Sequence, residues 1–444
     1  MSGAGGGLGT VAGRRFKPYP AYKDSGVEWL GEIPAHWTVS RMSELTSLVN
    51  GYPFDAGYFI LGEGWPLVRI RDLNATQTEV NYIGPVVENV WIEPGDVIVG
   101  MDGEFNVARW RGVRGLLNQR MCCLRARAET NAGFIAHLLP FPLAVINDLT
   151  YSTTVKHLSS VDVRKIRLGA PPQPEQRAIA AFLDQKTARI DALVAKKERL
   201  IELLREKRTA LITRAVTKGL DAHVPMKDSG VEWVGEIPAH WEARPLKYFL
   251  RAPLAYGVLK PDKFTGEDGV RLIRILDVES GQVSESALEV ISPEQSAEYR
   301  RTVVRAGDLV LSVVGTIGRT FIVPHSLEGA NLSRALARVQ LRPTLEHRFL
   351  EYGFSATVFQ SFTDLVPAGT AQRVLNLSDL AEYPVAAPPH TEQRAIAAFL
   401  NRETAKIDWL MEGVRQAIDR LREYRTALIS AAVTGKIDVR EEMA

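Results

Sequence analysis

Arginines are the residues whose type and spacing most clearly predict a chemistry. One set falls between residues 109 and 127 with no acidic residue among them: Arg109, Arg111, Arg114, Arg120, Arg125 and Arg127. A second set lies in the other half of the chain: Arg300, Arg301, Arg305, Arg319, Arg334, Arg338 and Arg342. A guanidinium group binds phosphate oxygens or a guanine edge through two parallel hydrogen bonds. For any single arginine an ion-paired surface position is the simpler explanation, but the two sets together favour nucleic-acid contact.

Polar side chains in turn-rich stretches extend this set. Loops can carry such side chains into a groove. The turn Gly315-Thr316-Ile317-Gly318 has small residues that would let the backbone approach a phosphate closely. The candidate nucleic-acid-binding residues are Tyr52, Arg109, Arg111, Arg114, Lys156, Tyr256, Lys260, Thr316, Arg319 and Arg373.

Catalytic motifs are missing from the sequence. It contains no phosphate loop, no Asn/Asp-Pro-Pro-aromatic tetrapeptide of the amino-methyltransferases, no His-Glu-x-x-His and no Cys-x-x-Cys. The adjacent Cys122 and Cys123 cannot complete a zinc site, and we expect them to be reduced core residues. His36 and His240 each precede a tryptophan, and a packing or capping role beside it is favoured. We therefore predict no catalytic and no metal-binding residues.

Length and charge define the broad class of protein. A chain of 444 residues is too long for one core, so two to four domains are expected. The formal net charge is only +2, so any basic surface must be local. No stretch approaches the ~18 apolar residues of a membrane span, and the few cysteines favour a cytoplasmic protein. Residues 1–22, Gly-rich at their start, are expected to form a disordered tail.

Two stretches of the sequence occur twice. Lys23–Trp37 returns as Lys227–Trp241 at a spacing of 204, with one difference in fifteen residues. Glu175–Leu183 returns unchanged as Glu392–Leu400 at a spacing of 217. Each copy of the second stretch follows a Pro-Pro pair and opens a long charged helical segment. The chain is therefore an internal repeat, in which an entry motif leads through a variable region to a long helix.

The variable regions share only a skeleton. Leu67–Leu73 and Leu272–Val278 alternate apolar and polar residues, as half-buried strands do. A Gly-Asp turn precedes an apolar strand in both copies. We interpret the regions as two copies of one α/β domain with diverged surfaces. After the tail, the expected organisation is an α/β domain at 23–170, a long helix at 171–222, a second α/β domain at 223–387 and a long helix at 388–444.

The long helices carry an apolar stripe at steps of three and four residues, the pattern of a coiled-coil seam. About 40 residues of helix span roughly 60 Å, and a helix of that length needs a partner. Matching registers favour pairing of the two helices with each other, as a spacer between the domains, over two separate appendages. The predicted seam consists of Ile190, Leu193, Leu200, Leu204, Leu211, Ile407, Leu410, Val414, Leu421 and Leu428.

These paired motifs, in this order, resemble the specificity subunits of type I restriction–modification systems. The resemblance covers residues 23 to 440 and rests on the two entry motifs, on Pro-Pro-x-x-Glu-Gln-Arg at 171–177 and 388–394, and on the helix ends Arg208–Thr217 and Arg425–Thr434. It implies an α+β fold. Two α/β target recognition domains would be separated by two long helices in an antiparallel coiled coil, with internal pseudo-two-fold symmetry.

The resemblance also implies a non-catalytic function. Each recognition domain would read one half of a bipartite, asymmetric site in double-stranded DNA. The chain, itself without a cofactor, would dock two modification subunits that use S-adenosylmethionine to methylate adenine. Restriction subunits using ATP and Mg²⁺ would add endonuclease activity. From the residues alone two alternatives stay open: a DNA methyltransferase or nuclease with an unrecognised active site, and a coiled-coil adaptor with no role on DNA.

Overall fold

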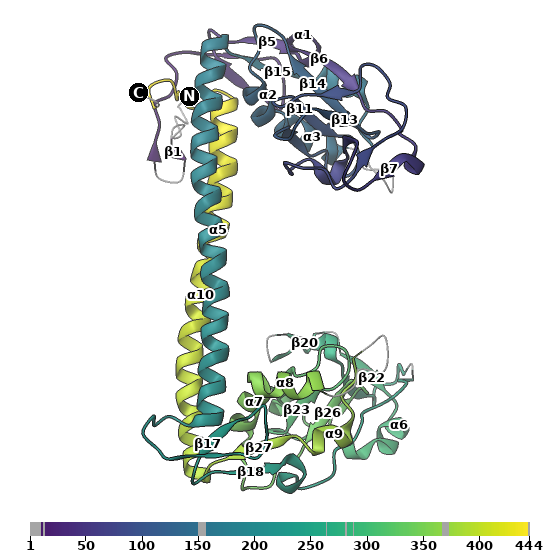
Figure 1. The fold of residues 1–444 in the computed structure, drawn as a ribbon, viewed down its shortest axis with the longest axis vertical. Coiled ribbons are helices and arrows are strands. Elements are labelled where there is room, and N and C mark those ends of the chain that lie inside the picture. Colours follow the sequence, from purple (N-terminus) through teal and green to yellow (C-terminus); the bar gives the residue numbers. More distant parts are fainter. Residues whose placement is uncertain are drawn as a thin grey trace. The chain divides into compact units, whose positions relative to one another are not determined.

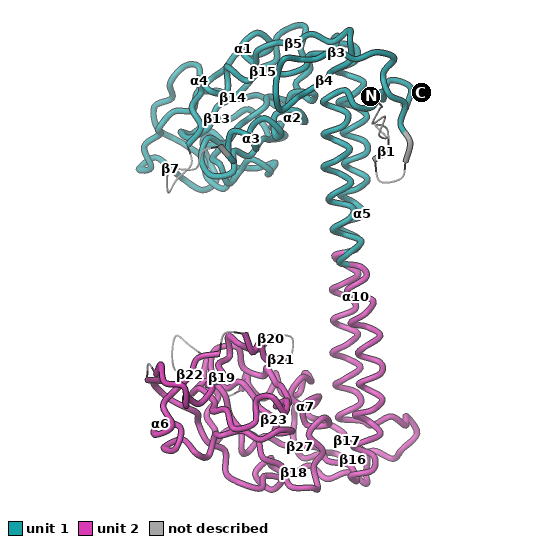
Figure 2. The backbone as a smooth tube through the Cα atoms, turned by 180° about the vertical axis from the view of Figure 1, so that it is seen from behind, with its two compact units in different colours: residues 1–197, 415–444 teal, residues 198–414 magenta. Residues whose placement is uncertain are grey.

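The protein consists of two compact units (Figure 2). A computed structural model describes residues 10–11, 14–149, 157–262, 264–279, 282–286, 288–365 and 373–442. Unit 1 comprises Met1–Lys197 and Arg415–Ala444, and unit 2 comprises Glu198–Val414. Both long helices continue through the division. Each unit therefore contains one α/β domain and a stretch of both helices.

Helix α5 (Gln173–Lys218) and helix α10 (His390–Val433) lie side by side and run in opposite directions (Figure 1). Each begins directly after a Pro-Pro pair, since proline suits the start of a helix, where its missing N–H leaves no bond unmade. Each is followed closely by a glycine with positive φ, Gly219 or Gly435, the backbone that commonly ends a helix. Both helices lie within the ranges expected from the sequence.

Most of the expected seam residues are withdrawn from solvent. Those that are fully or half buried are Ile190, Leu204, Leu211, Ile407, Val414, Leu421 and Leu428.

Three expected seam residues are exposed instead. Leu193, Leu200 and Leu410 are 48%, 42% and 46% exposed, so their assignment to the seam is wrong. Ile201 and Met411, the residues that follow two of them, are buried in their place. The error arises because an α-helix has 3.6 residues per turn, so a stripe of apolar residues can be continued by a step of three or of four residues. The two choices select neighbouring stripes on the helix surface, and apolar residues occur on both.

Two sheets form the framework of the α/β domain in unit 1. The four-stranded antiparallel sheet has the order β12 (Val107–Arg109), β11 (Val97–Gly100), β14 (Met121–Ala126) and β6 (Thr46–Asn50). The five-stranded sheet has the order β10 (Trp91–Ile92), β13 (Gly115–Leu117), β8 (Trp65–Val68), β9 (Asn81–Tyr82) and β7 (Phe59–Ile60), with β13 and β8 parallel. The helices are α1 (Met42–Leu45), α2 (Ala132–Leu138), α3 (Pro140–Leu149) and α4 (Ser160–Lys165).

Unit 2 repeats this framework with smaller sheets. One sheet has the order β24 (Thr320–Ile322), β23 (Leu309–Ser312) and β26 (Leu336–Val339). Another has the order β22 (Glu289–Ile291), β19 (Val270–Ile273) and β25 (Asn331–Leu332), with β19 and β25 parallel. A hairpin joins β20 (Val278–Glu279) and β21 (Gln282–Val283). The helices are α6 (Pro293–Glu298), α7 (His347–Ser355), α8 (Thr357–Leu365) and α9 (Leu377–Ala381).

The repeated entry motifs form the same structure in each unit. A hairpin of β3 (Tyr22–Asp24) and β4 (Glu32–Pro34) in unit 1 matches β16 (Met226–Asp228) and β17 (Glu236–Pro238) in unit 2. The next strand pairs with the one that leads into the long helix: β5 (Thr38–Arg41) with β15 (Arg167–Ala170), and β18 (Glu242–Pro245) with β27 (Pro384–Ala387). Trp37 and Trp241 are fully buried beside them.

The two stretches predicted as half-buried strands are strands only in part. β8 ends at Val68 and β19 at Ile273, and a 3₁₀ turn follows each, at Ile70–Asp72 and Ile275–Asp277. The carboxylates of Asp72 and Asp277 accept the backbone N–H three residues earlier, at 3.0 and 2.8 Å. An aspartate side chain that satisfies the local backbone in this way competes with the sheet.

The expected disordered tail is wrong for the residues from Phe16 onward. Phe16 and Tyr19 are buried in the core of unit 1. Lys17 pairs with Asp438 across an isolated bridge, and its Nζ lies 2.7 Å from Glu441. After α10, Ile437 and Val439 enter the same core. The N-terminal strands β1 (Thr10–Val11) and β2 (Arg14–Arg15) pair with each other, while residues 1–9, 12 and 13 lie outside the described part.

Cys122 and Cys123 are buried free cysteines in β14. Burial raises the pKa of the Cys122 thiol to about 12, and burial also raises the pKa of Cys123. Both thiols therefore stay protonated, in keeping with the predicted role as core residues. Among the described helices we find none with the length and apolar character needed to span a membrane.

Candidate nucleic-acid interface

Candidate residues of unit 2 meet where strand β23 ends. Gly315 N–H donates to the Arg373 carbonyl at 2.9 Å, which joins the turn 314–318 to the segment before α9. The N–H of Leu377 donates to the Tyr256 hydroxyl at 3.2 Å. We call this surface, formed by Tyr256, 314–319, 333–335 and 373–377, the loop edge of unit 2. The structure thus brings Tyr256, Thr316, Arg319 and Arg373 together.

The turn at Thr316 is held from beneath by a buried serine. Ser312 Oγ donates to the Thr316 carbonyl at 2.5 Å and accepts the N–H of Arg319 at 2.8 Å. Gly315 and Gly318 both have positive φ, which fits glycine at little cost. Thr316 and Arg319 are exposed on this fixed turn. A turn fixed in this way presents backbone and side chains without further ordering.

Arg373 forms an ion pair with Asp364 within unit 2. Its guanidinium lies 2.5 Å from Asp364, and both side chains are about half exposed. The hydrogen bond from Arg373 holds the pKa of Asp364 below its usual range. A phosphate or a base edge would therefore have to compete with the Asp364 carboxylate for this arginine.

Unit 1 has an edge built on the same backbone frame. The Met101 N–H donates to the Arg120 carbonyl and the Leu158 N–H to the Met101 carbonyl, as Val313 and Leu375 do in unit 2. Asp102 and His157 form the bridge that Val314 and Val374 form in unit 2. Tyr52 lies beside it, bridged to Asn118 and 42% exposed. We call Tyr52, 102–106, 118–120 and His157 the loop edge of unit 1.

The side chains on the two loop edges differ in chemistry. In unit 1 the Asp102 carboxylate lies 3.1 Å from the Arg120 guanidinium and 2.8 Å from His157 Nδ1. The structurally matching residues of unit 2 are Val314, Ala335 and Val374, which carry no charge. Asp102 and His157 were not among the sequence candidates. A comparison of the two repeats, strand by strand, identifies them as the positions where the matching residues of the other unit are apolar.

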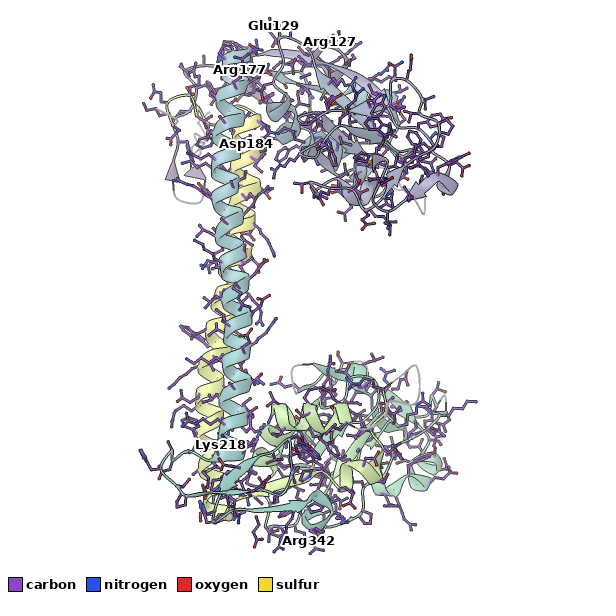
Figure 3. All side chains as sticks on the ribbon, in the orientation of Figure 1. Arg127, Glu129, Arg177, Asp184, Lys218 and Arg342 are labelled. Atoms are coloured by element: carbon purple, nitrogen blue, oxygen red, sulfur yellow. The ribbon has the colours of Figure 1, made fainter. Side chains whose placement is uncertain are left out.

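Three of the sequence candidates lie away from this edge. Arg109 lies at the end of β12 opposite Val97, and its guanidinium is 3.2 Å from Asp184 of α5. Asp184 is labelled in Figure 3. Arg114 is ion-paired with Glu93 at 3.1 Å and stacks 4.4 Å from the Trp91 ring. Arg111 is exposed and makes no ion pair or hydrogen bond with the described residues. Arg109 and Arg111 line a common groove, which Arg114 does not line.

Arg109 belongs to an ionic network that joins the domain to α5. Asp184 also accepts from His137 at 2.8 Å, beside a groove of about 660 Å³. Burial lowers the pKa of His137, although the hydrogen bond to Asp184 opposes this. The matching pair in unit 2 is uncharged: the Tyr352 hydroxyl donates to Asn401 at 2.8 Å. Arg109 thus has a structural partner that accounts for its position.

Two sequence candidates remain. Lys260 is exposed, and its carbonyl accepts from Gln295 at 3.1 Å. Lys156 lies outside the described residues.

The repeated histidines hold the long helices in place. His36 Nε2 lies 2.8 Å from Glu175, whose other oxygen accepts the Trp37 indole N–H at 2.9 Å. His240 and Trp241 make the same contacts with Glu392 at 2.8 and 3.2 Å. Each carboxylate stands in the first turn of its helix, where a negative charge is stabilised by the helix dipole. No group of three or more potential metal ligands occurs within the described residues.

Comparisons with known proteins agree on one family. The model for the type I restriction modification DNA specificity domain matches residues 34–203 and 273–420. The specificity subunit of the type I restriction enzyme EcoBI from Escherichia coli is 32% identical over 423 residues, covering 93% of this chain and 89% of the relative. That of EcoKI from Escherichia coli K12 is 22% identical, covering 92% of this chain and 90% of the relative.

Solved structures share the fold. A chain from a study of complex assembly and conformational transition of the type I R-M system matches with a TM-score of 0.68 at 18% identity, covering 90% of this chain and 98% of that chain. The HsdS subunit from Thermoanaerobacter tengcongensis matches with a TM-score of 0.50 at 18% identity, covering 91% of this chain and 98% of that chain. The predicted α+β class with two recognition domains and two long helices is confirmed. The chain belongs to the type I restriction modification DNA specificity family, and its role is DNA sequence specificity rather than catalysis.

Proposed function

We propose that unit 1 reads one half of a bipartite, asymmetric DNA site and that unit 2 reads the other half. The family role in DNA sequence specificity supports this division, because the chain contains two copies of one domain. Two copies with different reading surfaces are what an asymmetric site requires. The α5–α10 pair would fix the spacing between the half-sites.

The observation that carries this proposal is the pair of loop edges. Their backbones make the same hydrogen bonds, while polar Asp102, Arg120 and His157 in one are replaced by apolar residues in the other. Base identity is read through side chains at base edges, whereas a shared backbone frame only positions them. In unit 2 the reading groups would be Tyr256, Thr316, Arg319 and Arg373; in unit 1 they would include Tyr52, and Arg111 would remain free for phosphate.

We further propose that this chain docks two modification subunits and that restriction subunits join the assembly. Within unit 2 four large apolar side chains of the paired helices stay exposed: Leu200, Leu203, Trp409 and Leu410. Exposed apolar patches of this kind mark protein interaction surfaces. S-adenosylmethionine, ATP and Mg²⁺ would be bound by the partner subunits.

Exchanging one loop edge tests the division of labour. The triple variant Asp102→Val, Arg120→Ala, His157→Val gives unit 1 the side chains of unit 2 at these positions. In cells that express the chain with its modification subunits, sequencing of methylated adenines should show a change in one half-site and none in the other. Arg167→Ala, an exposed arginine of β15, should leave both half-sites unchanged. A change in both halves, or in neither, would contradict the proposal.

A binding series separates this function from the two alternatives. Affinity for site-containing DNA should fall steeply as salt rises, because phosphate contacts release counterions. A coiled-coil adaptor would show no such binding. A purified chain that turned over DNA with S-adenosylmethionine and Mg²⁺ would instead be an enzyme.

A further inference from the structure

One segment of unit 2 departs from the repeated frame. In unit 1 the strand β6 pairs continuously with β14, with Thr46 opposite Ala126 and Asn50 opposite Cys122. In unit 2 the corresponding bridges are Leu250 with Leu341 and Tyr256 with Ala337. Three residues separate the paired positions in unit 1 and five separate them in unit 2. Unit 2 therefore has two extra residues, and the segment 251–255 bulges from the sheet.

The sequence of this segment explains why it leaves the sheet. Pro253 has no N–H to donate to a neighbouring strand, and extra residues in one strand cannot pair. Arg301 Nη2 holds the bulge by donating to the carbonyls of Pro253 and Leu254, both at 3.2 Å. The result is a cavity of about 450 Å³ between the bulge, the turn at Lys247 and helix α9.

The charge of this cavity is positive. Lys247, Arg251 and Arg342 line it, and none of the described residues lining it is acidic. Arg342 (labelled in Figure 3) is fixed by the bond from its Nε to the Leu250 carbonyl at 3.0 Å. Lys247 is ion-paired with Glu382 at 2.6 Å. Arg251 is exposed and makes no ion pair or side-chain hydrogen bond with any described residue.

The cavity adjoins the loop edge of unit 2. Leu377 lines the cavity, and its N–H donates to the Tyr256 hydroxyl. The bulge leads directly into Tyr256. The cavity and the loop edge of unit 2 therefore lie next to each other on the same unit.

We propose that Arg251, Arg342 and Lys247 form a binding site for a backbone phosphate of the DNA flanking the half-site of unit 2. The inference rests on the proposed function. Arginine forks bind phosphate through paired hydrogen bonds, and such contacts fix the position of the protein on the duplex without reading sequence. Unit 1 lacks the site, because Ser47 follows Thr46 on a paired strand where Arg251 follows Leu250 on a bulge. The phosphate anchor is specific to one half of the chain.

Arg251→Ala is the test, because its side chain has no described partner whose loss would unfold the domain. The full chain, assembled with its modification subunits, is titrated by fluorescence anisotropy with a duplex carrying its mapped site, from 50 to 200 mM salt. The variant should bind several-fold more weakly, and the slope of log affinity against log salt should become less negative by about 0.9, the value for one phosphate. Methylation mapping should give unchanged half-site sequences. Arg348→Ala, a half-exposed arginine of α7 paired with Glu351, is the matched control and should keep the wild-type slope.

Three results would overturn the proposal. Arg251→Ala could leave affinity and slope unchanged. It could alter the recognised bases, which would make Arg251 a reading residue. Inorganic phosphate could raise the melting temperature of wild type but not of Arg251→Ala while DNA binding stayed equal, which would assign the cavity to a free anion. Failure of the wild-type assembly to bind DNA would instead refute the proposed function itself.

Discussion

The guanidinium Nε of Arg208 on α5 lies 3.1 Å from the carboxylate of Asp408 on α10. Arg425 on α10 makes the same contact with Asp191 on α5, at 2.9 Å. Arg208 and Arg425 are 217 positions apart, and so are Asp191 and Asp408; this is the spacing of the helix repeat. The two ion pairs are therefore two copies of one contact with the helices exchanged, one in each unit. Two repeated helices that pair in opposite directions produce this exchange.

Charge exchange at Arg208 tests the contribution of the contact. Arg208→Asp places two carboxylates together and should lower the free energy of unfolding by about 1 kcal/mol, the scale of exposed ion pairs. The double variant Arg208→Asp, Asp408→Arg should recover most of the loss. Urea denaturation measures both. A double variant no more stable than the single one would show that the pair contributes nothing.

Alanine substitution at two neighbouring residues tests the seam. Ile201 is buried and Leu200 is exposed. Ile201→Ala should cost about 2–4 kcal/mol because it leaves a cavity between the helices. Leu200→Ala should change stability by about 0.5 kcal/mol or less. The reverse order in thermal denaturation would restore the original seam assignment. Leu200→Ala should weaken binding of a modification subunit, since its side chain is exposed on the surface proposed for docking.

Removing the charge of Glu175 tests the contact that holds the start of α5. The buried carboxylate accepts from both His36 and Trp37. Glu175→Gln keeps the size but replaces one acceptor oxygen by a donor, so either the buried Trp37 indole or the exposed His36 imidazole loses its acceptor. Loss of the acceptor of the buried indole should cost about 1–3 kcal/mol. Glu129→Gln, an exposed control, should stay within about 0.5 kcal/mol of wild type in chemical denaturation. Equal effects of the two changes would refute the proposed anchoring.

The half-buried His137 predicts a pH dependence of stability. Burial lowers its pKa, so the unfolded chain binds a proton more readily than the folded chain. Its contribution is therefore present above the unfolded pKa of about 6.5 and is lost as the pH falls below it. The variant His137→Tyr, Asp184→Asn reproduces the uncharged pair Tyr352 and Asn401 of unit 2 and should remove this dependence. Melting temperatures between pH 5 and 8 provide the measurement. A variant that loses stability on acidification as steeply as wild type would exclude His137 as the source.

The repeated sequence was sufficient to predict the architecture. Identical stretches at Glu175–Leu183 and Glu392–Leu400 must form identical elements, and the Pro-Pro pairs locate the helix starts. The Gly315–Gly318 turn was predicted from its glycines, which adopt the positive φ of such a turn at little cost. Local chemistry alone fixes these features, so a single sequence reveals them.

The arrangement of side chains from distant segments could not be predicted in this way. Arg109, Arg111 and Arg114 are close in sequence, yet Arg109 pairs with Asp184 of α5 and Arg114 with Glu93. Their directions depend on strand pairing and on partners far along the chain. The packing of Phe16 against Phe182 was not predicted, because the Gly-rich start of the chain led to the expectation of disorder for the apolar residues that follow it as well. The bulge at Pro253 appears only when the strand registers of the two units are compared.

Unit 1 is built from both ends of the chain, so it can fold completely only after the whole chain has been synthesised. Its core contains Trp37 and Phe134 together with Leu428, Val433 and Val439. A ribosome completes all of unit 2 before it makes the last five helical turns of α10 and the segment that follows them. The first domain to emerge is thus the last to be finished, and until then the apolar surface that packs against the end of α10 stays uncovered.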